Sequence, residues 1–98
     1  MFIKGKVRED ERKSFVKIVE YAVSVLSSQP MEMDRQRAVS LDISNGGMGI
    51  ITGFPLEQGQ VLTFAKEIPI NTLISKRAAV VKWTEKLNNK YRAGLKFL

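Results

Sequence analysis

Cysteine and histidine are both absent from this 98-residue sequence. Without cysteine the chain can form no disulfide and has no thiol chemistry, which is typical of a reducing compartment such as the bacterial cytoplasm. Without histidine it lacks the commonest general base and the commonest metal ligand. The remaining residues show no constellation of carboxylates or activated lysine that could replace them. We therefore predict a cytoplasmic protein that is not an enzyme, with no catalytic residues, no metal site and no catalytic cofactor.

Long hydrophobic runs are also missing. No apolar stretch approaches the roughly 20 residues that a membrane span needs. The first ten residues, MFIKGKVRED, lack the apolar core of a signal peptide. The sequence therefore predicts neither membrane insertion nor export. Hydrophobic residues make up 44% of the chain, which is enough for the core of one small domain.

Acidic residues become scarce in the last third of the chain. The formal charge is +6, and beyond Glu67 the only carboxylate side chain is that of Glu85. The basic residues of that region are Lys76, Arg77, Lys82, Lys86, Lys90, Arg92 and Lys96. Such an excess favours an anionic partner, although it equally suits a solvated surface that keeps the protein soluble. Charge alone does not distinguish a polynucleotide from a phosphorylated small molecule.

Alternating apolar residues and turn signals predict strands along most of the chain. Val19, Tyr21 and Val23 share one parity in a segment dominated by β-branched and aromatic residues. Proline, glycine and the pair Asn88-Asn89 supply breaks and a tight hairpin. No window keeps a helical period for more than two turns. The predicted strands are residues 15–27, 36–44, 48–53, 61–68, 72–87 and 90–98.

Strands that follow one another without crossover helices favour an antiparallel barrel or sandwich. A barrel is the better interpretation, because closure leaves no unpaired edge on so small a sheet. We therefore predict an all-β fold, a six-stranded antiparallel β-barrel over residues 15–98. A flexible, charged arm over residues 1–14 precedes it, and no long C-terminal helix follows.

The turn in LDISNGGMGI carries the most informative polar residues. In a regular strand Asp42 and Ser44 lie on one face, opposite Leu41 and Ile43. Adjacent glycines give the backbone freedom and allow a ligand to approach it closely. A carboxylate could accept the two neighbouring N–H groups of a guanine edge. The alternative is local, since Asp and Ser before a turn often bond to nearby backbone.

The same residues resemble the Asp-x-Ser-x-x-Gly signature of PilZ domains, small bacterial β-barrels that bind cyclic di-GMP. The signature falls on Asp42, Ser44 and Gly47. Two further blocks are similar to the family, ERKSFVKIVEYAVSV before it and AAVVKWTEKLNNKYRAGLKFL at the end. The resemblance covers residues 11–98 and implies a six-stranded barrel with cyclic di-GMP as its ligand.

The family's second motif, Arg-x-x-x-Arg before the first strand, is altered. The literal pattern Arg8-x-x-x-Arg12 lies five residues early, and alignment on the strand places Lys13 and Lys17 at the arginine positions, directly after Arg12. Lysine keeps the charge but loses the planar fork that binds phosphate or guanine in two places. The resemblance implies a ligand set of Arg12, Lys13, Lys17, Asp42, Ser44 and Gly47, with Arg8, Asn45 and Trp83 as further candidates. Trp83 could stack on a base, although a lone tryptophan in so small a barrel is more often core.

Three functions follow from these patterns. The first is a cyclic di-GMP sensor that orders its N-terminal arm against the barrel and so signals to a downstream protein. The alternative is a degenerate adaptor that no longer binds the nucleotide and acts through protein contacts. A direct nucleic-acid binder ranks last, because no strand carries the clustered exposed aromatics of a base-stacking surface.

Overall fold

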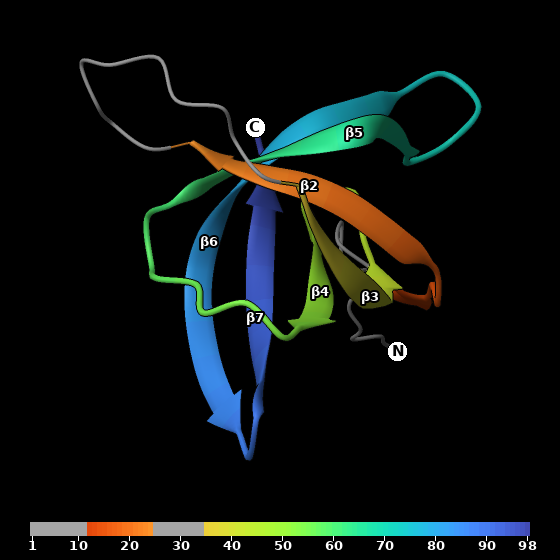
Figure 1. The fold of residues 1–98 in the computed structure, drawn as a ribbon. Coiled ribbons are helices and arrows are strands. Elements are labelled where there is room, and N and C mark those ends of the chain that lie inside the picture. Colours follow the sequence, from red (N-terminus) through yellow and green to blue (C-terminus); the bar gives the residue numbers. More distant parts are fainter. Residues whose placement is uncertain (1–11, 25–34) are drawn as a thin grey trace, which may run out of the picture.

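The computed structural model describes residues 12–24 and 35–98, and these residues form strands connected by turns and loops (Figure 1). Among the described residues there is no helix that could cross a membrane. The strands are β1 (Lys13–Ser14), β2 (Ile18–Ser24), β3 (Gln36–Ile43), β4 (Gly47–Thr52), β5 (Val61–Pro69), β6 (Ser75–Leu87) and β7 (Lys90–Phe97).

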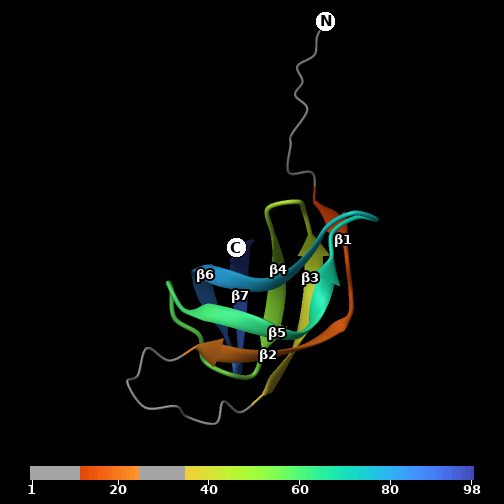
Figure 2. The same cartoon turned by 90° about the horizontal axis from the view of Figure 1, so that it is seen from above.

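Six of these strands close into an antiparallel barrel. Around the barrel the order is β2, β3, β4, β7, β6 and β5, and β5 pairs with β2 to complete the circle. The view from above shows this ring (Figure 2). The short β1 is an additional strand that pairs with the end of β3, where Ser14 lies opposite Asp42. The predicted six-stranded barrel is confirmed.

Most predicted strands lie within a few residues of the observed ones, with two differences of note. The predicted first strand corresponds to β2, and its residues 25–27 lie outside the described part of the chain. The strand predicted to begin at residue 72 begins at Ser75, because Asn71 forms a turn in which its side-chain oxygen accepts the backbone N–H groups of Leu73 and Ile74 at 2.8 and 3.0 Å. The predicted Asn88-Asn89 hairpin is confirmed, and Asn88 has a φ of 49°.

The core follows the alternation seen in the sequence. Tyr21, Leu62 and Phe64 are 0–1% exposed, and Phe64 meets Phe97 edge to face at 6.4 Å between ring centroids. Phe15 is partly buried against the same cluster. The polar end of Tyr21 is not left unpaired, because its hydroxyl lies 2.7 Å from the hydroxyl of Thr52. Tyr21, Phe64 and Phe97 therefore lie in the barrel interior, with Phe15 at its margin.

Tyr21 makes the stability of the barrel pH-dependent. Burial raises the pKa of Tyr21 above its ordinary value of 10.0, and the hydrogen bond with Thr52 partly offsets that rise. The folded state therefore holds this proton more tightly than the unfolded state does, so the stabilisation is present below about pH 10 and is lost as the pH rises further. We expect denaturant unfolding to show this loss, and expect Tyr21→Phe to remove that step at a cost of roughly 1 kcal/mol at neutral pH. An identical alkaline loss in Tyr21→Phe would contradict this assignment.

Candidate ligand-binding site

A β-bulge in β3 turns Asp42 to the outside of the barrel. Ser40 pairs with Ile50 and Asp42 pairs with Gly49, so that Leu41 is one extra residue in β3. Ser40 is fully buried, and in a regular strand Asp42 would point inward with it. A bulge shifts the alternation by one residue. The prediction that Leu41 and Ile43 share one face is therefore wrong: Ile43 is buried, whereas Leu41 is only partly buried.

A second bulge does the same for Trp83 in β6. Val81 pairs with Leu95 and Trp83 pairs with Gly94, which leaves Lys82 as the extra residue. Val81 is buried in the core, but Trp83 lies on the outer surface and is 45% exposed. Of the two alternatives left open for Trp83, burial in the core is therefore wrong. The bulge reverses the face that a period of two assigns to it.

The two bulges place Asp42 and Trp83 at opposite ends of one row across the sheet. In that row Asp42 pairs with Gly49, Gly49 with Gly94, and Gly94 with Trp83. We call these four residues the glycine row. The indole covers Gly94 so closely that a Cβ at Gly94 would lie 2.2 Å from its Nε1 atom. The row is thus a shallow surface with a carboxylate at one end and an aromatic ring at the other.

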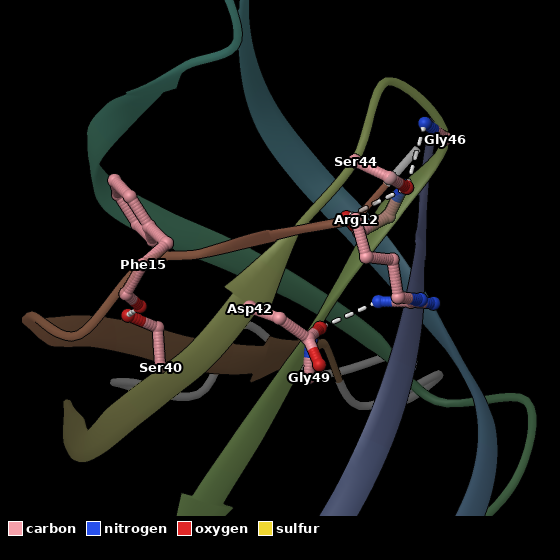
Figure 3. A network of polar contacts seen from close by, with 8 residues as sticks. Arg12, Phe15, Ser40, Asp42, Ser44, Gly46 and Gly49 are labelled. Carbon is pink, nitrogen blue, oxygen red and sulfur yellow. Dashed lines mark hydrogen bonds and ion pairs between the residues drawn. The ribbon is translucent and has the colours of Figure 1, made fainter. Parts of the chain in front are cut away.

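Asp42 is held by backbone and by an arginine. Its Oδ1 atom accepts a hydrogen bond from the backbone N–H of Gly49 at 3.1 Å and one from the guanidinium of Arg12 at 2.5 Å (Figure 3). The side chains of Arg12 and Asp42 are 49% and 32% exposed. Within the described part of the chain both bonds fall on Oδ1. The other carboxylate oxygen, Oδ2, receives no hydrogen bond from those residues.

Ser44 has a different environment from Asp42. It is 6% exposed, and its hydroxyl oxygen accepts the N–H groups of Gly46 and Gly47 at 3.3 and 3.2 Å. The hydroxyl also lies 3.3 Å from the carbonyl of Gly47, to which it donates. The expected pairing of Asp42 and Ser44 on one exposed face is not observed, because the chain turns after Ile43 and Ser44 closes that turn.

Gly47 has its own structural requirement. Among the described residues, positive φ angles occur at Gly59 and Asn88, and not at Gly46 or Gly47. A Cβ at Gly47 would instead lie 1.9 Å from the carbonyl oxygen of Leu95 in β7. Gly47 is therefore needed because the backbone of the neighbouring strand β7 passes close to it.

A hollow of about 220 Å³ opens beside the glycine row. It is lined by Arg12, Ser44, Gly46, Gly47, Lys82, Trp83, Gly94, Leu95 and Lys96. The guanidinium of Arg92 lies 5.6 Å from the centre of the Trp83 ring. Three basic residues, Arg12, Lys82 and Lys96, thus line the hollow, and Arg92 lies over Trp83 at its edge. Such a surface suits an anion with a flat aromatic part.

The other residues predicted to bind the ligand do not line this hollow, or they lie outside the residues that the structure describes. Lys13 is exposed in β1. The ammonium of Lys17 lies 5.3 Å from the centre of the Phe15 ring, and Lys17 lines a different hollow, between β2 and β5. Asn45 is exposed in the turn before Gly46. Arg8 lies outside the described residues.

The sequence analysis missed Lys82, Arg92, Lys96 and Gly94 as site residues. Gly94 was noted only as part of the closing block AAVVKWTEKLNNKYRAGLKFL, and the three basic residues only as part of the charge excess. The sequence carries no local signal for them, because the bulge between Val81 and Trp83 is defined only by the pairing of β6 with β7. Finding them required the register of β4, β7 and β6.

Comparison with known proteins agrees with this geometry. The sequence matches the PilZ domain over residues 6–98. The chain belongs to the PilZ domain family. PilZ domains are binding modules rather than catalysts, and the predicted resemblance is confirmed. Curated proteins give no match to the chain.

Two solved structures share the PilZ fold of this chain. The Bacillus subtilis inhibitor of motility, MotI/DgrA, superposes with a TM-score of 0.56 at 21% identity, over 94% of this chain and 43% of that one. The complex of K. pneumonia MrkH with c-di-GMP gives a TM-score of 0.50 at 16% identity, over 96% of this chain and 45% of that one. This chain therefore spans less than half the length of either protein. At these identities the likeness concerns the fold.

Proposed function

We propose that this PilZ domain binds cyclic di-GMP on the glycine row and acts as a sensor module. The observation that carries the proposal is the row itself, since two bulges turn a carboxylate and an indole outward with two glycines between them. MrkH, whose complex with c-di-GMP has a similar fold, supports the choice of ligand.

Each part of the row suits one part of the nucleotide. The carboxylate of Asp42 can accept the two neighbouring N–H groups of a guanine edge, one on each oxygen, once Arg12 has left Oδ1. The indole of Trp83 offers a stacking face. The basic residues around the hollow would neutralise the two phosphates of the ligand. The hollow is smaller than the roughly 300–1,000 Å³ of pockets that enclose small molecules. The dinucleotide would therefore lie across the surface, with one base in the hollow.

Arg12 links the site to the N-terminal residues. Its guanidinium pairs with Asp42 in the structure, and the same fork can pair with a phosphate or with guanine O6 and N7. We propose that the ligand replaces Asp42 as the partner of Arg12. The residues before Arg12 would then take a new position against the barrel, and a downstream protein could detect that change. Only contacts that differ between the two states can drive such a shift.

A second candidate function is an adaptor that keeps the barrel without the nucleotide. The observation that favours it is the pair of lysines at the motif positions, of which Lys17 lies on Phe15, at a hollow other than that of the glycine row. Lysine contacts phosphate as a point charge and stacks poorly on a base. Such a domain would act through protein contacts.

Calorimetric titration separates the two functions. We expect cyclic di-GMP to bind the parent chain with a Kd of about 1 μM or tighter, which corresponds to about 8 kcal/mol. A Lys13→Arg/Lys17→Arg variant should bind at least about tenfold more tightly if the restored forks reach phosphate or guanine. Binding by the double variant alone would identify a barrel that has lost its ligand. No heat from either chain would contradict the sensor proposal.

A further inference from the structure

A second hollow lies between β2 and β5, away from the glycine row. Its volume is about 600 Å³. One wall is formed by the residues around the beginning of β2, Phe15 and Lys17–Glu20, and the other by the second half of β5, Ala65–Pro69. Arg37 completes it, and its guanidinium lies 3.4 Å from the carboxylate of Glu20. We call this hollow the β2–β5 cleft.

The cleft exists because two neighbouring strands separate. The ladder between β2 and β5 ends where Tyr21 lies opposite Phe64. On the other side of β5 the register with β6 jumps from Thr63 opposite Ala78 to Ile68 opposite Lys76. Residues 65–67 therefore have no ladder partner in any described strand, and they line the cleft. Unpaired strand backbone of this kind is a place where another chain can bind.

The hairpin between β5 and β6 presents an apolar tip beside this cleft. Leu73 is 92% exposed and Ile74 is 48% exposed. The tip has a fixed shape, since Asn71 accepts the two N–H groups described above and the N–H of Ile70 donates to the carbonyl of Ile74 at 2.9 Å. Figure 1 shows the hairpin extending beyond the barrel on the side where β2 begins. A rigid apolar tip loses little conformational entropy when it is buried.

We propose that the β2–β5 cleft binds the β5–β6 tip of a second copy of this chain. Leu73 of one copy would lie between Ile18, Val19 and Ile68 of the other. Because β5 runs directly from the cleft wall into the tip, the two surfaces are neighbours on one molecule. A two-fold axis can therefore satisfy both contacts at once, as closed dimers require.

The charges of the two surfaces suit a contact between two copies. Residues 70–75, INTLIS, carry no charge in a chain of net charge +6. The tip of one copy would therefore bring no like charge into the cleft of the other. The cleft itself contains both signs, since Lys17, Arg37 and Lys66 line it together with Glu20 and Glu67. We expect one tip in one cleft to bury less than the roughly 1,600 Å² of standard interfaces, so the dimer should be weak and concentration-dependent.

Cross-linking tests the proposed contact directly, because the chain has no cysteine of its own. A Leu73→Cys chain is mixed with an Ile18→Cys chain under mild oxidation, and the heterodimer is measured by mass. The control mixes Leu73→Cys with Leu87→Cys, whose residue is 38% exposed on the β6–β7 hairpin. We expect a several-fold excess of the disulfide between positions 73 and 18. Equal yields in the two mixtures would overturn the proposal.

Sedimentation equilibrium provides a second test without introduced disulfides. The parent chain should associate as its concentration rises, Leu73→Asp should remain a monomer, and Leu87→Asp should associate like the parent. Both changes lie at exposed positions, so loss of folding does not confuse the comparison. A parent chain that stays monomeric at about 1 mM, where a contact of about 4 kcal/mol would be half formed, would also overturn the proposal.

Discussion

Replacing Gly47 by alanine is expected to lower the free energy of unfolding by about 3 kcal/mol or more. The added Cβ would lie 1.9 Å from the carbonyl oxygen of Leu95 and 3.0 Å from its carbonyl carbon. Both atoms are backbone, so no side-chain rotation can relieve the overlap, and β4 must move away from β7. Inserted atoms of this kind cost roughly 1–3 kcal/mol, occasionally more. In a domain of this size that lowers Tm by about 12 °C or more.

Gly53→Ala is the matched control for this substitution. It makes the same chemical change just beyond β4, but nothing lies within 4 Å of the position a Cβ would take. Gly53 has no positive φ, so alanine should be neutral or stabilising by up to about 1 kcal/mol. Thermal or denaturant unfolding of the two variants measures the difference. Equal stabilities would show that β4 and β7 tolerate a side chain at Gly47.

Asp42→Ala is expected to weaken cyclic di-GMP binding by between about 30-fold and several thousand-fold. Removing one member of a desolvated, hydrogen-bonded charge pair costs roughly 2–5 kcal/mol. The variant loses the carboxylate proposed to bind the guanine edge, and the N–H of Gly49 loses its acceptor. Calorimetric titration measures the change in affinity. Since Asp42 is at the surface, stability should fall far less than in Gly47→Ala.

Glu20→Ala is the control for Asp42→Ala. Glu20 is also a partly exposed carboxylate with an arginine partner, Arg37, and it has the same charge. It belongs to the β2–β5 cleft and not to the glycine row. The control should bind the nucleotide like the parent chain. Equal losses in both variants would indicate a general effect of charge, and unchanged affinity in Asp42→Ala would remove this residue from the site.

The barrel could be predicted because its strands alternate over most of their length. Leu62 and Phe64 in β5 and Val19 and Tyr21 in β2 occupy the inward positions that a period of two assigns to them. The prediction failed where one inserted residue changes the parity, at Leu41 in β3 and Lys82 in β6. Nothing in the local composition marks these insertions, since each depends on which residue of the neighbouring strand lies opposite.

The site could be predicted only in part for the same reason. Asp42 stood out because it matches the Asp-x-Ser-x-x-Gly signature together with Ser44 and Gly47. For Trp83 the core was the commoner alternative to base stacking, because a lone tryptophan in so small a barrel is usually buried. Lys82 and Lys96 line the same hollow because β6 pairs with β7. Both strands are far from Asp42 in the sequence, so the sequence alone does not bring these residues together. Ser44 was predicted to contact the ligand, but its hydroxyl accepts the N–H groups of Gly46 and Gly47 in the turn that follows it.

The most direct test of the proposed site is a titration of the ¹⁵N-labelled chain with cyclic di-GMP, followed by amide NMR. Trp83 is the only tryptophan, so its indole N–H gives a single signal at one end of the glycine row. We predict that this signal and the amide signals of Gly49 and Gly94 shift most, while the amides of Ile18 and Ile68 in the β2–β5 cleft stay in place. A spectrum that does not change, or shifts confined to the cleft, would contradict the proposal that the glycine row binds the nucleotide.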